Sequence, residues 1–474
     1  MDRWRRVLAL LLALVVLGAA CSSGGGSDEA TGADPDGPAT GDVGDKVNED
    51  VDTEDVRPGV EVVAYEELIP AAIEDIQVFW EAELPAAFGQ DYLFVPEANQ
   101  VPYSSEEPPP SCGGQELSYE EMANNAFWCY PDDYMAWDDE GLFPDLYREY
   151  GPFAVAMVLA NEWGIGVQDQ IEYEDATIIM EQQADCFAGA WAAHELATDS
   201  ALGFRTADLE IALGGMLKFR DQPGTTSEDP SAHGSGFDRI NAFQEGFELG
   251  TDRCAEYAVD PPTQVDLVFL DESDFESGGN LPYDDAIELA SRDLNDYWTE
   301  LNSSFVPVEE IIPYDPATER VPDCGGTQLS EEDGTYVVLF CFEENYVIWD
   351  DVMMRTVHEN IGDFGVATLL GLTWTQAAQK QLGLPEDFVA SQDGSFQQAC
   401  FTGAWAGRLM VPDDTRQISA LSPGDLDEAI QAFLSFAETP DERGRTTLGS
   451  AFERSQAFRV GFFDGAESCD AFGG

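Results

Sequence analysis

The stretch GPFAVAMVLANEWGIGVQ, residues 151–168, decides the fold of this chain. Its positions are almost all apolar, which is typical of a helix buried on every side. A second stretch of the same character, FGVATLLGLTWTQAA, occupies residues 364–378. The sequence therefore predicts one buried helix over 153–167 and another over 364–378, each at the centre of its own core.

Further motifs surround both helices in the same order, which indicates a tandem repeat. The offset between the two copies drifts between 211 and 218 residues, as small loop insertions and deletions produce. We therefore predict a first module at 61–258, a connector at 259–280 and a second module at 281–474. The recurring motifs are CGG at 112 and 324, WD at 137 and 349, and CFAGAW at 186 against CFTGAW at 400.

Each module is expected to be α+β and predominantly helical. Its opening helix is amphipathic, with Ile69, Ile73, Ile76 and Trp80 at helical spacing in the first copy. Segments 126–137 and 335–349 are rich in aromatic and β-branched residues and predict short strands. Within the connector, residues 265–270 predict one further strand.

The N-terminus has the features of an export signal. Arg3, Arg5 and Arg6 precede an apolar run over 7–17 that is too short to span a bilayer. Gly-Ala-Ala-Cys, residues 18–21, resembles a lipobox, so residues 1–20 are read as a lipoprotein signal peptide and Cys21 as the lipidated residue. An ordinary secretory signal with an incidental cysteine is the alternative. Residues 21–60 are polar and predict a disordered tether. The expected location is extracytoplasmic, lipid-anchored to a bacterial cell membrane.

The charge balance is strongly acidic, with 93 Asp and Glu residues against 21 Lys and Arg. A formal net charge of −72 repels nucleic acid and anionic headgroups, so no nucleic acid partner is expected and any membrane contact is assigned to the lipid anchor. The acidic clusters over 132–140 and 343–351 are interpreted as solvated strand edges, with Ca²⁺ binding as the alternative.

The cysteines other than Cys21 form two matched sets of four. Disulfides are expected in an exported protein, although four cysteines allow three pairings. A thiolate metal site is disfavoured because no C-x-x-C pair is present. The favoured pairs are Cys112–Cys129, Cys186–Cys254, Cys324–Cys341 and Cys400–Cys469.

The motifs at Asn161-Glu162, at Glu181-Gln-Gln-Ala-Asp-Cys186 and at His233-Gly-Ser resemble those of the neutral zinc metallopeptidases of bacteria. That family implies a zincin-like fold with His-Glu-x-x-His and a later glutamate that completes the zinc site. The resemblance assigns Glu162 to the general base and Glu181 to the third ligand. Asn161 and Ile165 stand at the two histidine positions.

The second module has lost the catalytic motif as well, since Leu372, Thr373 and Gln376 replace His, Glu and His. A zincin needs two imidazoles one helical turn apart. We therefore expect no cofactor, and a catalytically inactive protein with a binding or scaffolding role. Its expected partner is an extended polypeptide or an active peptidase homologue. The alternatives are an atypical zinc peptidase with residual activity in the first module, and a purely structural envelope lipoprotein.

Overall fold

The computed structural model describes residues 63–198, 200, 202–315, 317, 322–324, 327–328, 338–410, 420–437 and 446–472. The predicted signal peptide, Cys21, the whole predicted tether and residues 61–62 of the first module lie outside these ranges. Among the described residues, no helix has both the length and the apolar composition needed to cross a bilayer.

The fold is α+β and predominantly helical, as the sequence predicts. The first module contains a three-stranded sheet of order β1-β3-β2, in which β1 is parallel and β2 antiparallel to β3. Its elements are α3 (Tyr65–Phe88), β1 (Gln100–Tyr103), α4 (Tyr119–Met122), β2 (Ala126–Cys129), β3 (Tyr134–Asp138), α5 (Leu142–Tyr150), α6 (Pro152–Gln170), α7 (Thr177–Ala197), α8 (Thr206–Met216), α9 (Gly236–Leu249) and α10 (Thr251–Glu256).

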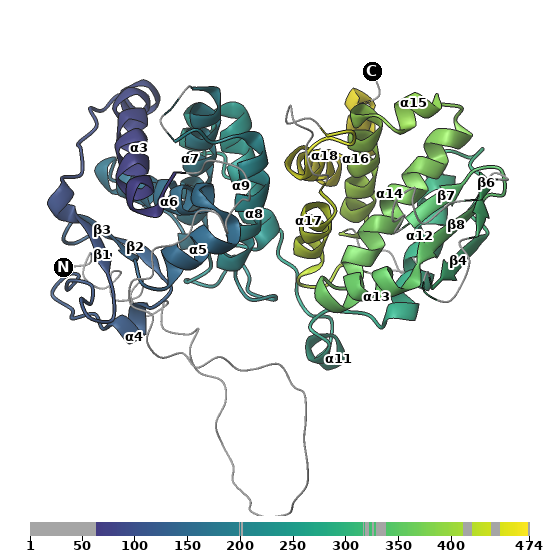
Figure 1. Ribbon diagram of the computed structural model, residues 1–474, viewed down its shortest axis with the longest axis horizontal. Coiled ribbons are helices and arrows are strands. Elements are labelled where there is room, and N and C mark those ends of the chain that lie inside the picture. Colours follow the sequence, from purple (N-terminus) through teal and green to yellow (C-terminus); the bar gives the residue numbers. More distant parts are fainter. Residues whose placement is uncertain are drawn as a thin grey trace, which may run out of the picture.

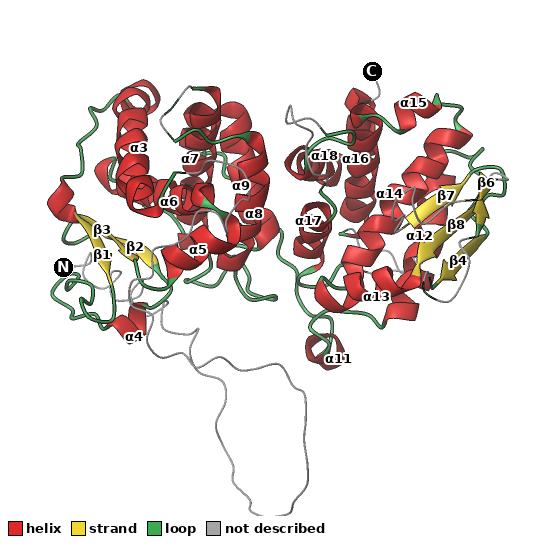
Figure 2. Ribbon diagram, viewed as in Figure 1, coloured by secondary structure: helices red, strands yellow, loops and turns green. Residues whose placement is uncertain are grey.

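The second module contains a sheet of order β4-β8-β7 with the same parallel and antiparallel pairings. The two sheets lie at opposite ends of the molecule, with helices between them (Figure 2). The elements are α12 (Tyr283–Leu301), β4 (Glu310–Tyr314), β5 (Asp323–Cys324), β6 (Thr327–Gln328), β7 (Val338–Cys341), β8 (Tyr346–Asp350), α13 (Asp351–Asn360), α14 (Asp363–Gln381), α15 (Glu386–Val389), α16 (Gln392–Leu409), α17 (Asp425–Ser435) and α18 (Ala451–Asp464).

The predicted central helices are α6 and α14, and both are buried over most of their length. Beside them, α7 packs closely on α9, and α16 packs closely on α18. A Cβ at Gly189 would lie 2.0 Å from the carbonyl oxygen of Phe243, and one at Gly403 would lie 1.9 Å from that of Phe458. The glycine of the CFxGAW motif is therefore required by the close approach of two helix backbones.

All four favoured disulfides are present. Cys112–Cys129 and Cys324–Cys341 each close a 17-residue separation beside the sheets, while Cys186–Cys254 and Cys400–Cys469 close separations of 68 and 69 residues. The second pair in each module ties α7 or α16 to the end of that module.

The predicted strand over 265–270 is not formed. This segment has no regular secondary structure and pairs with no strand, and α11 (Glu272–Glu276) follows it. Instead, the connector is held by side chains of the first module: the backbone N–H of Val265 donates to Asp238, and Asp266 accepts from Ser227. A largely apolar run is not sufficient for a strand when no sheet edge lies beside it.

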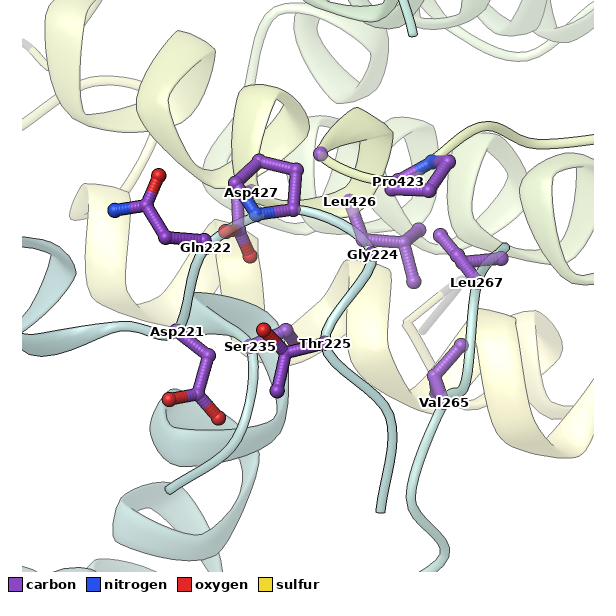
Figure 3. Close-up of a pocket in the computed structure, with 12 residues that line it drawn as sticks. Asp221, Gln222, Gly224, Thr225, Ser235, Val265, Leu267, Pro423, Leu426 and Asp427 are labelled. Atoms are coloured by element: carbon purple, nitrogen blue, oxygen red, sulfur yellow. The ribbon is translucent and has the colours of Figure 1, made fainter. Parts of the chain in front are cut away.

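The two modules meet along α8 and α9 on one side and α17 and α18 on the other (Figure 1). The junction contains aromatic contacts between Phe237 and Phe462 and between Phe247 and Phe452. A pocket of about 30 Å³ lies at its edge, between the loop around Asp221 and Gly224 and the start of α17 (Figure 3).

Candidate functional site

The residues that the resemblance assigns to a zinc site lie on α6 and α7, which pack against each other. Asn161 and Ile165 are one turn apart on α6 and are half-buried, and Glu162 between them is buried. Glu181 is half-buried on α7. Residues four apart lie on the same helix face, so the two former histidine positions do point the same way.

Asn161 is held by an ion pair rather than by either glutamate. Its amide Nδ2 donates to Asp185 Oδ1 over 2.8 Å. The guanidinium of Arg239 on α9 donates to both oxygens of the same carboxylate, again over 2.8 Å each. Asp185 and Arg239 are 1% and 7% exposed, so this is a buried, bidentate pair.

Glu162 lies in surroundings that favour its neutral form. Burial raises the pKa of its carboxyl well above the usual range, Glu181 raises it further, and Arg239 opposes both. The backbone of Trp128 on β2 hydrogen bonds to the carboxyl, while Glu162 Oε2 is buried without a hydrogen-bond partner. A protonated glutamate cannot act as a general base, because only its ionised carboxylate is basic enough to accept a proton from water.

These residues do not fit a zinc ion. Ile165 has no donor atom, and the amide of Asn161 is oriented by Asp185, with its nitrogen toward the carboxylate. The two glutamates alone lack the nitrogen or sulfur ligands of a strong tetrahedral site. Within the described ranges, two groups of at least three close His, Cys, Asp or Glu ligand atoms occur, and neither includes a residue of this site.

The three histidines of the chain, none of which lies on α6, make contacts of other kinds. His233 Nδ1 lies 3.3 Å from Asp221, which also accepts from the backbone N–H of His233 and Gly234. Hydrogen bonding to Asp221 raises the pKa of His233 against the opposing effect of burial. His194 packs beside Phe79, and His358 Nε2 lies 2.8 Å from the carbonyl oxygen of Leu281. None of the three lies in a group of close metal-ligand atoms within the described part of the chain.

The second module repeats the geometry without the acidic groups. Leu372 and Gln376 are half-buried on α14 as Asn161 and Ile165 are on α6, and Thr373 is buried in the place of Glu162. The Thr373 hydroxyl donates to the Leu369 carbonyl over 2.9 Å and so serves the helix itself. Ala399 takes the place of Asp185. This half of the chain therefore offers no acid, base or ligand at the matching positions.

The acidic clusters interpreted as solvated strand edges contain two buried aspartates that accept hydrogen bonds from backbone N–H groups. Asp138 is fully buried and accepts from the backbone N–H groups of Asn124, Glu140 and Gly141. Asp350 is the N-cap of α13. The interpretation is wrong for these two aspartates because loop and helix N–H groups, rather than water, satisfy their carboxylates.

Sequence reasoning assigned no role to Arg239 or Asp185. They are 54 residues apart, and no local pattern joins them. The available signal was the arginine itself, a charged residue close in sequence to the apolar Phe237, Ile240 and Phe243 of α9. Such a residue requires a buried counter-charge.

Comparison with known proteins places this resemblance in the first module. Residues 111–257 match the family described as "Putative neutral zinc metallopeptidase". The chain is also 30% identical over 149 residues to uncharacterized protein YpfJ of Escherichia coli K12, and equally to YpfJ of the O6:H1 strain CFT073. These alignments cover 26% of the chain and 50% of each relative, so the chain spans about half the length of the curated relatives it matches. No solved structure matches the chain. Through its first module, the chain resembles the neutral zinc metallopeptidase family.

Proposed function

We propose that this protein is a lipid-anchored, extracytoplasmic, tandem metallopeptidase-like protein that binds a polypeptide without cleaving it. The observation that carries this proposal is the hydrogen bond from Asn161 to the Asp185–Arg239 ion pair. Asn161 occupies one of the two histidine positions, and its amide is already hydrogen-bonded to Asp185. Ile165, at the other histidine position, has no atom that could bind a metal.

Catalysis by a zincin requires a metal-bound water and an ionised base. The pKa of Glu162 is raised well above its usual range by burial and by Glu181, which works against the second requirement. The missing imidazoles work against the first. The first module lacks both the metal ligands and an ionised base, so restoring only one of these two requirements would not restore activity.

A binding role is supported by a cleft of about 470 Å³ beside α3, within the size range of ligand pockets. Apolar side chains contribute much of its wall, and Val78 and Phe94 are 53% and 50% exposed. The remaining lining includes Ile69, Ile73, Gln77 and Trp137. An extended polypeptide, from a substrate-like partner or from an active peptidase homologue, is the ligand that this surface suits.

The direct test is elemental analysis of the purified chain after dialysis against dilute zinc, together with a peptidase assay. We expect no stoichiometric zinc and no cleavage. One tightly held zinc per chain, with activity lost on Glu162→Gln, would establish the atypical peptidase instead. Peptide-array binding, compared between the wild type and Phe94→Ser, then separates a binding protein from a purely structural lipoprotein.

Anchoring is tested at Cys21. If residues 21–60 form the predicted flexible tether, they would have a mean reach on the order of 30–40 Å and would hold the folded part clear of a membrane. Cys21→Ala is expected to release the protein from the membrane fraction or to leave it unprocessed. A Cys21→Ala protein that is still processed and membrane-bound would contradict the lipid anchor.

A further inference from the structure

Three buried carboxyl groups meet where α14 and α17 begin in the second module. Asp363, Asp425 and Glu428 are 7%, 6% and 7% exposed. One oxygen from each lies within 4.8 Å of the others. Asp363 is the first residue of α14, and the other two lie in the first turn of α17. We call this set the carboxylate triad.

Backbone N–H groups hold each member in place. Leu281 donates to Asp363 over 3.1 Å, Ser422 donates to Asp425 over 2.8 Å, and Phe364 donates to Glu428 over 2.8 Å. The Glu428 carboxyl sits directly against the backbone of Gly362, where a Cβ would lie 2.1 Å from it. The arrangement is thus built by two chain segments that are some 60 residues apart, and a glycine makes room for it.

The triad nevertheless has an unsatisfied oxygen. Asp363 Oδ1 is buried and has no hydrogen-bond partner, although Asp363 Oδ2 accepts from Leu281. Among the described residues, no Lys or Arg forms a salt bridge with any of the three, and the nearby His358 ring hydrogen bonds to the Leu281 carbonyl. The charge of His358 lowers the pKa of Asp363 alone. Buried carboxylates are costly without enough positive charge beside them, so three of them could accommodate a cation.

We propose that the carboxylate triad binds one divalent cation of the calcium class. All its ligand atoms are oxygens, the donors that hard cations prefer over zinc. Oxygens on opposite sides of a Ca²⁺ ion at about 2.4 Å lie about 4.8 Å apart, so the three groups are close enough to share one ion. Asp363 Oδ1 would gain the partner that it lacks.

The electrostatics of the triad agree with a missing cation. Burial, with Asp363 as the strongest neighbouring charge, raises the pKa of Glu428 to about 8 and that of Asp425 well above its usual range. Burial raises the pKa of Asp363 to about 6. Cation binding to these carboxyls should therefore displace protons.

The first module has no such triad. Asp208 lies in the first turn of α8 and accepts from the Arg205 backbone N–H, as Asp425 in the first turn of α17 accepts from that of Ser422. Pro152 and Ile211 stand at the places of Asp363 and Glu428. One specific site per chain is therefore expected, and Asp208 supplies a matched buried aspartate that does not belong to it.

The site also adjoins the junction between the modules. Asp427 lies between Asp425 and Glu428 in the sequence and reaches the other module, where it accepts from the backbone N–H of Phe237 over 2.8 Å and pairs with Arg220 over 3.3 Å. Asp427 also lines the junction pocket (Figure 3). An ion at the triad would fix the first turn of α17, which contacts both modules.

The first experiment is calorimetric titration of the EDTA-treated, dialysed wild-type chain with CaCl₂ at constant ionic strength. The second is thermal melting of the same protein with and without CaCl₂. We expect one saturable site with a raised Tm, and proton release on binding. Glu428→Gln and Asp363→Asn should weaken binding at least about tenfold, because affinity depends on the number of charged ligands. The control Asp208→Asn should bind as the wild type does.

Weak, unsaturable binding to the acidic surface, equal in the wild type and both triad variants, would overturn the proposal. So would the absence of any Tm change with Ca²⁺ in the wild type, a result that does not depend on whether the variants fold. If the variants fold and melt in EDTA at or above the wild-type temperature but no longer respond to Ca²⁺, the site is established.

Discussion

The ring of Phe247 packs edge-to-face on that of Phe452, with centroids 4.9 Å apart, across the boundary between the two modules. Phe237 and Phe462 make a second contact at 5.1 Å. Phe452 follows Phe237, and Phe462 follows Phe247, by 215 positions. The two contacts are therefore equivalent when the modules are exchanged. This is the geometry of a self-complementary two-fold interface, realised within one chain.

We predict that Phe452→Ala destabilises the whole chain by about 3–4 kcal/mol, because a large buried ring is lost from the junction. The Phe247–Phe452 pair should show a coupling of about 1 kcal/mol in a double-mutant cycle. Urea denaturation measures both quantities. Phe342→Ala, at a ring 46% exposed, is the control and should cost far less. A coupling near zero would mean that the modules do not rely on this contact.

The former zinc site can be rebuilt in the first module. Asn161→His with Ile165→His places two imidazoles one turn apart, near Glu162 and Glu181. We expect measurable zinc binding by elemental analysis, at a stability cost of a few kcal/mol for altering packed positions. The matched control is Leu372→His with Gln376→His in the second module, where Thr373 and Ser395 replace the carboxylates. It should bind zinc far more weakly, and equal affinity in the two would refute the alignment with the peptidase site.

Non-reducing peptide mapping should recover the four disulfides of the structure and no free thiol among these eight cysteines. Replacing Cys186 and Cys254 by serine should cost about 4 kcal/mol on the chain-entropy model, and replacing Cys112 and Cys129 about 3, because the first loop is longer. Chemical denaturation under oxidising conditions tests this order. A disulfide between the two modules in the peptide map would contradict the predicted pairing.

The carboxylate triad predicts a pH dependence in EDTA. The folded-state pKa of Glu428 is raised to about 8 from an ordinary value of 4.5, so the folded state retains the proton more strongly than the unfolded state does. Its contribution to stability is then lost as pH rises from about 4.5 through about 8. His358, Asp274 and Asp427 also act on the triad, from α13, α11 and α17.

The Glu428→Gln variant, which cannot ionise at this position, should therefore lose less stability than the wild type between pH 6 and 8, the range between the raised pKa values of Asp363 and Glu428. Melting temperatures in EDTA across this range measure the difference. Saturating Ca²⁺ should reduce the slope for the wild type alone. Parallel curves for the two proteins in EDTA would show that Glu428 does not titrate in this window.

Local features of the fold were predictable because they depend on residues close in the sequence. The apolar runs set α6 and α14, the spacing of Ile69, Ile73 and Ile76 sets the buried face of α3, and the cysteine pattern in two matched sets led to the observed pairs. The strand expected over 265–270 failed for the converse reason. A strand needs a partner, and its backbone met Asp238 instead of a sheet.

By itself, the sequence determined where the two apolar helices and the two matched sets of cysteines lie, and that neither helix carries the two histidines of a zincin. Only the tertiary structure decided that Asn161 bonds to Asp185 and Arg239, that Asp363 meets Asp425 and Glu428, and that Phe247 meets Phe452. These groups are between 24 and 205 positions apart along the chain. Periodicity and residue type specify which face of a helix is buried, whereas the partner on the other side is set by how helices far apart in sequence pack together.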